Sequence, residues 1–165
     1  MINCLLAVGK PKQAHWREAL EVYAARLRGY GGCELISVRP MAEERGCSPE
    51  DIMRQEGERL LCRLRPGDTV WVLAGEGEGL TSPQLARRLQ KAQSSRRLVI
   101  IVGGQLGLSP QVKARSGLLL SLGAITLPHE LAAVVALEQL YRAHTILAGL
   151  PYHRFSDGLD GPRSA

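Results

Sequence analysis

The stretch that decides the fold is residues 98–154, LVIIVGGQLGLSPQVKARSGLLLSLGAITLPHELAAVVALEQLYRAHTILAGLPYHR. It starts with an apolar run that ends in two glycines and continues through a short helical patch. A second apolar run, LLLSLGAITLPHE, then leads into a long apolar helix closed by PYHR. Short apolar runs bounded by glycine are typical of buried strands. Two glycine-bearing turns this close together predict a pocket lined by main chain rather than by charged side chains.

The residues before this stretch alternate between strand and helix patterns. One helix carries apolar side chains at Trp16, Leu20, Tyr23 and Leu27, a second is capped by Ser48 with Pro49 in its first turn, and a third begins at Ser82. We expect GEGEGLTSP, which precedes the third helix, to be a loop. The strands are INCLLAV (2–8), CELISVRP (33–40), TVWVLA (69–74) and RLVIIV (97–102). This order predicts an α/β fold, with a mainly parallel sheet and helices on both faces.

The composition is that of one globular domain with a basic charge. Hydrophobic residues make up 45% of the 165 residues and charged residues 22%, and the net charge is +5. A basic chain favours a polyanionic partner, with nucleic acid as the first candidate. Each basic cluster taken alone is more typical of a solvated face than of a phosphate-binding site. Taken together, the clusters leave RNA or DNA as a possible partner. The clusters are Arg59/Arg63/Arg65, Arg87/Arg88/Lys91 and Arg96/Arg97.

The four cysteines show no CxxC pair and no metal-ligand spacing with the four histidines. We therefore expect no zinc site and no other metal. The chain has no signal-peptide pattern and no apolar run of transmembrane length, so we expect a cytoplasmic protein without membrane contact.

Two glycine-rich turns compete for the binding site. The first, GEGEG at residues 75–79, has the wrong spacing for a dinucleotide fingerprint, and its two carboxylates would repel a pyrophosphate. The second, Gly103-Gly104, is either a tight turn at a strand end or a point where a ligand approaches the main chain. In a parallel sheet, Leu73-Ala74, Gly103-Gly104 and residues 122–127 would meet beyond the carboxyl ends of the strands. They could hold one flat apolar ligand, and adenine fits that description.

The long helix is apolar almost all round, which requires the sheet on one side and, as we expect, a second copy of the chain on the other. Its polar residues allow two interpretations each. Glu138 and Arg142 form either an ordinary i,i+4 ion pair or part of a site. His129 either caps the helix or acts chemically, and His153 is either simply exposed or functional.

Several motifs carry a resemblance to a known family. They are VGGQLGLSP, LSLGAITLPHELAAVVALEQLYRAHTI and PYHR, together with AVGK at residues 7–10, EGE at 56–58 and SPQLA at 82–86. In this order they resemble the RlmH family of SPOUT-class methyltransferases, over nearly the whole chain. The family methylates N3 of a pseudouridine in 23S ribosomal RNA, so the resemblance implies that RNA, in the ribosome or large subunit, as partner.

The resemblance further implies a deep trefoil knot at the carboxyl-terminal end, one of the rare exceptions to unknotted folds. It implies a homodimer in which the tail of one subunit, here Tyr152, His153 and Arg154, helps to complete the site of the other. Loss of the N3 proton requires a base or a group that stabilises the anion. The candidates for that catalytic role are His129, Glu138, Arg142, His153 and Arg154. The implied S-adenosylmethionine site comprises Leu73, Gly103, Leu122, Gly123, Ala124, Ile125, Thr126 and Leu127.

The chain departs from the family pattern at a few positions. Ala74 stands where family members carry an aspartate, Ala133 where they carry an arginine, and Gln105-Leu106 where an acidic or aromatic residue is usual. Residues 155–165 extend beyond the usual end and are expected to be disordered. We therefore expect residues 1–154 to form a single methyltransferase domain. The alternative function is a non-catalytic RNA- or ribosome-binding module that keeps the knotted fold.

Overall fold

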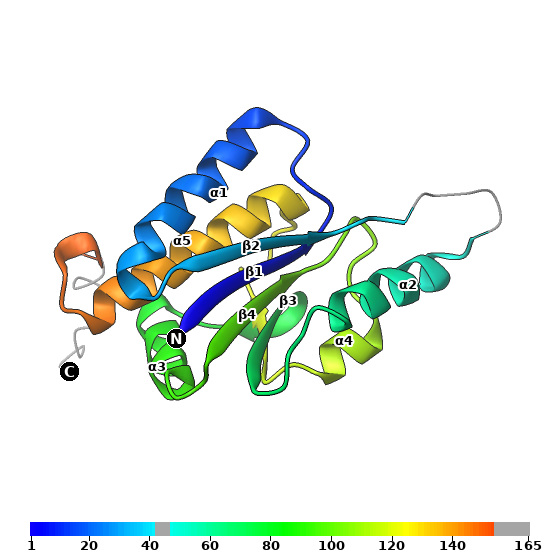
Figure 1. Ribbon diagram of the computed structural model, residues 1–165. Helices are drawn as coiled ribbons and strands as arrows, with labels where there is room; N and C mark the ends of the chain where they lie inside the picture. The colour runs from blue at the N-terminus through cyan, green and yellow to red at the C-terminus, as the bar shows by residue number, and fades with distance from the viewer. Residues whose placement is uncertain (42–46, 154–165) are drawn as a thin grey trace, which may run out of the picture.

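The fold is built on a five-stranded parallel sheet. The computed structural model describes residues 1–41 and 47–153. The strand order is β2-β1-β4-β3-β5, and every pairing is parallel, so the predicted mainly parallel α/β fold is confirmed (Figure 1). The strands are β1 (Ile2–Val8), β2 (Cys33–Val38), β3 (Asp68–Gly79), β4 (Arg97–Val102) and β5 (Leu118–Ser121).

Helices cover both faces of the sheet. On one face lie α1 (Ala14–Arg26), the 3-10 turn η1 (Leu27–Tyr30), α3 (Ser82–Ala92) and α5 (His129–Leu147). On the other lie α2 (Pro49–Leu61) and α4 (Pro110–Ala114). Because side chains alternate along a strand, Ile100 of β4 packs under α5 while Ile101 packs under α2 and α4. All six residues of β4 are buried, as expected for the central strand of a covered parallel sheet.

Two helices begin where the sequence predicts. The Ser48 hydroxyl accepts a hydrogen bond from the main-chain N–H of Asp51, 3.1 Å away, and Pro49 occupies the first turn, so the predicted cap of α2 is confirmed. Helix α3 begins at Ser82, and Thr81 caps it through a capping box with Gln84. These caps fix where α2 and α3 begin.

The glycine-rich GEGEG segment is part of β3, and the expectation of a loop there is wrong. Leu73 and Glu78 both pair with Leu120 of β5, so residues 74–77 bulge out of the ladder before pairing resumes. Gly77 allows this close approach, because a Cβ there would come within 2.7 Å of the main-chain carbon of Leu120. The bulge projects at the carboxyl-terminal edge of the sheet.

Arg97 also differs from expectation, since it belongs to the core and not to a solvated basic cluster. Its side chain is only 3% exposed. Its guanidinium donates to both carboxylate oxygens of Asp68 and, 3.0 Å away, to Glu34. Burial would raise the pKa of Asp68, but hydrogen bonds from Arg97 and from the Arg65 N–H outweigh it and hold the pKa below its usual value. The pair joins β3 to β4 at the amino-terminal edge of the sheet.

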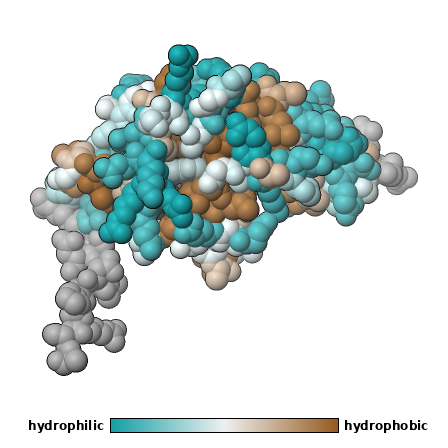
Figure 2. Space-filling view, turned by 90° about the horizontal axis from the view of Figure 1, so that it is seen from below, coloured by the Kyte–Doolittle hydropathy of each residue, from teal (hydrophilic) through white to brown (hydrophobic). Residues whose placement is uncertain are grey.

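The surface is mixed in character. Figure 2 shows the face seen from below, where hydrophilic residues cover most of the area and apolar side chains are visible between them in patches. Of the large apolar side chains that remain exposed among the described residues, Ile125 is the most exposed, at 74%. In the described part of the chain, no helix is both long and apolar enough to cross a membrane.

Candidate functional site

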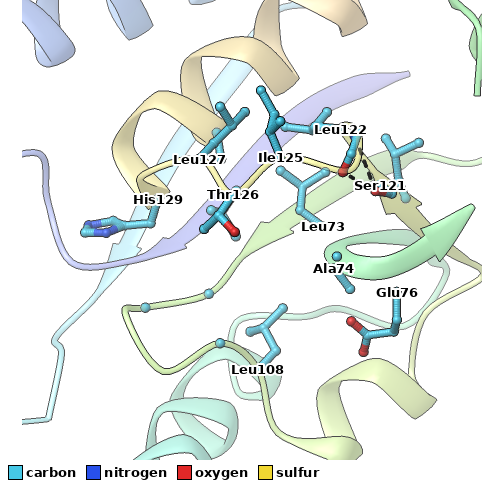
Figure 3. A pocket seen from close by; sticks show the side chains of 18 of the residues that line it. Leu73, Ala74, Glu76, Leu108, Ser121, Leu122, Ile125, Thr126, Leu127 and His129 are labelled. Atoms are coloured by element: carbon cyan, nitrogen blue, oxygen red, sulfur yellow. Dashed lines mark hydrogen bonds between the residues drawn. The ribbon is translucent and has the colours of Figure 1, made fainter. Parts of the chain in front are cut away.

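A cavity of about 370 Å³ lies at the carboxyl ends of three neighbouring strands (Figure 3). The bulge of β3 contributes residues 73–76, the turn after β4 contributes residues 103–105, and the segment after β5 contributes residues 121–127. The structure therefore brings together the three segments whose convergence the sequence predicts. All eight residues expected at the cofactor site line this one cavity.

The turn after β4 accounts for both interpretations of its glycines. The Gly107 N–H donates to the Gly104 carbonyl over 3.1 Å, which closes a tight turn. A Cβ on Gly103 would come within 2.8 Å of the Gly107 oxygen and of the Leu108 side chain. Glycine is therefore required by the turn itself. The same absence of a side chain leaves the main chain of Gly103 and Gly104 as part of the cavity wall.

The segment after β5 also presents main chain to the cavity. The Ser121 hydroxyl accepts from the Gly123 N–H and donates to the Gly123 carbonyl, which fixes the start of the segment. Gly123 has a φ of +129°, a conformation that favours glycine. Ile125, labelled at the rim in Figure 3, is left largely exposed. The segment thus offers N–H and C=O groups and one uncovered apolar side chain to a ligand.

The remaining walls divide the cavity into an apolar part and a charged part. The side chains of Leu73, Leu108 and Leu122 supply apolar surface, whereas Glu76 and Lys113 supply the charges. The Lys113 ammonium lies 2.5 Å from a carboxylate oxygen of Glu76 and, by donating a hydrogen bond, holds the pKa of that carboxyl below its usual value. Sequence reasoning missed this pair, because it treated Glu76 only as an obstacle to phosphate and did not single out Lys113.

His129 opens helix α5 beside the cavity. Pro128 occupies the cap position, so of the two interpretations of His129 the one in which it caps the helix is wrong. The imidazole points away from Leu73 and Leu122 in Figure 3, although the residue lines the cavity wall. The structure shows no hydrogen bond between this ring and any other residue that it describes. In a neutral imidazole one ring nitrogen carries a proton and the other can accept one.

Three other catalytic candidates, Glu138, Arg142 and His153, are not among the residues that line this cavity. Glu138 pairs with Arg142 and also accepts a hydrogen bond from the Tyr152 hydroxyl over 3.1 Å, and the Arg142 guanidinium lies 4.7 Å from the centre of the Tyr152 ring. This cluster ties the 3-10 turn η2 (Pro151–His153) to α5. His153 is half-buried in that turn. Arg154 lies outside the described residues, as do residues 155–165.

Burial and the nearby Glu138 carboxylate raise the pKa of Tyr152 to about 12, so the hydroxyl stays protonated and continues to donate its hydrogen bond to Glu138.

Along the described ranges, no group of three or more His, Cys, Asp or Glu side chains has the arrangement of a metal site. The polar groups that line the cavity include the His129 imidazole, the Glu76–Lys113 pair and exposed main chain.

This combination defines a class of protein. A parallel sheet with a cavity beyond the carboxyl ends of its strands, lined by glycine turns and few charged groups, is the arrangement found in α/β proteins that bind nucleotides or nucleoside-containing cofactors. The sequence model of the family described as "Predicted SPOUT methyltransferase" matches residues 1–153.

Individual relatives agree with this match. A protein of Oenococcus oeni is 39% identical over 93% of this chain and 100% of its own length. Proteins of Gloeobacter violaceus and Pelobacter propionicus are each 41% identical over 90% of this chain, and over 96% and 97% of their own lengths. All three are named ribosomal RNA large subunit methyltransferase H. The chain belongs to the SPOUT methyltransferase family, in the group that carries this name, and the resemblance found in the sequence is confirmed. Membership also implies the trefoil knot.

Proposed function

We propose that this protein transfers a methyl group from S-adenosylmethionine to N3 of a pseudouridine in large-subunit (23S) ribosomal RNA. The observation that supports this most directly is the single cavity that unites Leu73, Gly103 and residues 122–127. The shared name of the relatives supports the RNA substrate. Because the substrate is ribosomal RNA, a cytoplasmic location is part of the same proposal.

The residues around the cavity fit this cofactor. Exposed N–H and C=O groups of residues 122–127 suit the edge of an adenine ring, and the leucine side chains suit its faces. Lys113 and Glu76 would hold the carboxylate and the ammonium group of the amino-acid part, because opposite charges at one end of the cavity match that zwitterion. When bound, the cofactor supplies a methyl group on a positively charged sulfur that leaves as a neutral thioether.

The protein's contribution is to position the acceptor and to receive its proton. In the proposed transfer N3 would gain the methyl group as the bond between that group and the cofactor's sulfur breaks, and the proton on N3 would pass to a base. His129 is the histidine at the cavity, and its ring nitrogens are not engaged by the described residues, so we assign it this role. Positioning should account for most of the rate, since the methyl group is already activated.

We propose that the tail completes this site in a dimer. Tyr152 packs on Glu138, which is nine residues from His129 along α5, so at 1.5 Å per residue it lies about 14 Å along the helix axis from the proposed base of its own subunit. Tyr152, His153 and Arg154 would therefore complete the site of a second copy, which is the arrangement we propose. In that assembly Arg142 and Arg154 could stabilise the developing anion or hold a phosphate, and Glu138 would position Tyr152. Residues 1–154 would act as one domain.

Two measurements test this function. Titration calorimetry with S-adenosylmethionine should show binding, and absence of binding would exclude the enzyme. Deletion of the gene in its host, followed by mapping of large-subunit pseudouridines, should show the loss of one N3 methyl group. An unchanged methylation pattern together with retained ribosome binding would instead support the non-catalytic binding module.

A further inference from the structure

A second cavity, of about 340 Å³, lies beside the first along the same edge of the sheet. It sits beyond the carboxyl ends of β1 and β2, where Lys10 and Met41 follow the strands, and it reaches the turn after β4. Its volume is in the range of small-molecule pockets, about 300–1,000 Å³. The two cavities thus flank the exit of the central strand, one over β3 and β5 and the other over β1 and β2.

The two cavities adjoin at Gly104, Gln105 and His129, which line both. The main chain of Gly104 lies close to other residues that line the second cavity. A Cβ there would come within 2.9 Å of a Glu56 carboxylate oxygen and within 3.3 Å of the Val8 side chain. A group bound in the second cavity would therefore lie next to the cofactor, with the His129 imidazole at the boundary.

The walls of the second cavity are fixed by two carboxylates. Glu130 accepts a hydrogen bond from the Lys12 main-chain N–H over 2.7 Å, which holds the loop after β1 against the first turn of α5. Glu56, only 6% exposed, accepts from the Met41 N–H over 2.9 Å, which holds the chain after β2 against α2. The main chain is thereby held in place at Lys12 and at Met41.

Two motifs that the cofactor cavity does not use meet here. The AVGK motif contributes Gly9 and Lys10, and the EGE motif contributes Glu56. The walls also include apolar side chains of Val8, Met41 and Ile52. The charges of the lysines and glutamates balance, because two of each line the cavity, and both lysines are exposed to solvent. A neutral planar ring with polar edges suits a cavity with apolar walls and balanced charges, and an anion suits the two exposed lysines.

We propose that the second cavity receives the acceptor base, a neutral uracil-type ring turned out of the RNA stack, while Lys10 and Lys12 bind the phosphates that flank it. This inference rests on the proposed function and names its acceptor site. Enzymes that modify a base commonly extrude it into a pocket. His129, which lines both cavities, then faces the ring nitrogen that loses its proton and accepts the methyl group.

The experiment compares Lys10→Gln/Lys12→Gln with His129→Gln and with Lys91→Gln, an exposed lysine of α3 that lines neither cavity. Calorimetry measures affinity for S-adenosylmethionine, and sedimentation measures affinity for ribosomes purified from the deletion strain, without relying on turnover. We expect the lysine pair variant to keep its cofactor affinity and to bind ribosomes about tenfold more weakly. The plot of the logarithm of its ribosome-binding constant against the logarithm of salt concentration should be less steep by about 1.4, because two contacts to single-strand phosphates are lost. His129→Gln should keep both affinities and lose at least about 100-fold in kcat.

Three results would overturn the inference. Unchanged ribosome affinity in the lysine variant would remove the acceptor site from this cavity. A parallel loss of cofactor affinity would assign the cavity to the cofactor, and dissociation of the protein into monomers would make it a subunit contact. Failure of the proposed function is distinguishable, because it appears in the wild-type protein as an absence of cofactor binding or of methyl transfer.

Discussion

The Nε2 atom of His144 lies 3.1 Å from the Oδ1 atom of Asn3, and this contact joins the last turns of α5 to the first strand of the sheet. The Asn3 amide also donates to the main-chain carbonyls of Tyr30 and Gly32, so its amide oxygen accepts from His144. The Tyr30 ring stacks on the imidazole with 4.8 Å between ring centres. Both Asn3 and His144 are buried. One neutral hydrogen-bonded cluster therefore connects the two ends of the fold.

His144 makes the stability of the protein sensitive to mild acid. Burial, aided by the nearby N-terminal ammonium group, lowers the pKa of His144 to about 4. The unfolded chain takes up this proton near pH 6.5, so the stabilising effect is fully present above pH 6.5 and is lost as the pH falls toward 4. Because of this group, we expect the free energy of unfolding to be about 2 kcal/mol lower at pH 5 than at pH 7.5. Urea unfolding at the two pH values measures this difference.

The matched variants are His144→Gln, which keeps an amide donor but does not titrate, and His15→Gln on the exposed part of α1. In the wild type the free energy of unfolding differs between pH 7.5 and pH 5, and His144→Gln should reduce this difference by about 2 kcal/mol. His15→Gln should show the same difference as the wild type. Identical pH dependence in His144→Gln and the wild type would show that other groups control it.

Much of this architecture is predictable from the sequence, for a physical reason. β4, RLVIIV, is buried on both faces, and the apolar run marks it without ambiguity. The convergence of Leu73, Gly103 and residues 122–127 also follows, because carboxyl ends of parallel strands share one edge. The continuation of β3 through Gly79 does not follow, since glycine-rich segments disfavour strands and only contact with β5 makes this one pair.

Buried ionic groups set the other limit of sequence reasoning. Arg97 follows Arg96 and looks like part of a basic surface cluster, yet its three hydrogen-bonded neighbours, Asp68, Glu34 and the Arg63 carbonyl, come from distant parts of the chain. Nothing local distinguishes such an arginine from an exposed one. Similarly, Glu76 and Lys113 are 37 positions apart and meet only because the β3 bulge projects toward α4.

The ion pairs of Arg97 with Asp68 and Glu34 should contribute to stability and should not affect ligand binding. Asp68→Asn leaves the buried guanidinium without its main counter-charge and should cost about 3–5 kcal/mol of unfolding free energy. Glu34→Gln, at the half-exposed end of the cluster, should cost no more than about 1 kcal/mol. Urea denaturation gives both values. Cofactor affinity should stay unchanged in the folded variants, because the cluster lies at the opposite edge of the sheet. Equal costs for the two substitutions would contradict this ranking.

The Glu76–Lys113 pair should recognise only the amino-acid part of the cofactor. Lys113→Met removes the partner of the ligand carboxylate, so affinity for S-adenosylmethionine should fall about tenfold, or about 1.4 kcal/mol. Affinity for 5′-methylthioadenosine, which lacks the amino acid, should remain within about twofold, because its adenine and ribose contacts are untouched. Calorimetry with both ligands measures this, and Lys91→Met serves as the control. A similar loss for both ligands would place Lys113 at the nucleoside or make its role purely structural.

The composite site can be tested by complementation between subunits. A chain truncated after Leu150 keeps its cavity but lacks Tyr152, His153 and Arg154, whereas a full-length His129→Gln chain keeps the tail but lacks the proposed base. Each alone should bind S-adenosylmethionine and transfer almost no methyl groups. After co-refolding in equal amounts, half of the dimers are mixed and each contains one complete site, so activity should recover to about a quarter of wild type. Full activity of the truncated chain alone, or no recovery on mixing despite dimer formation, would show that each subunit works independently of its partner's tail.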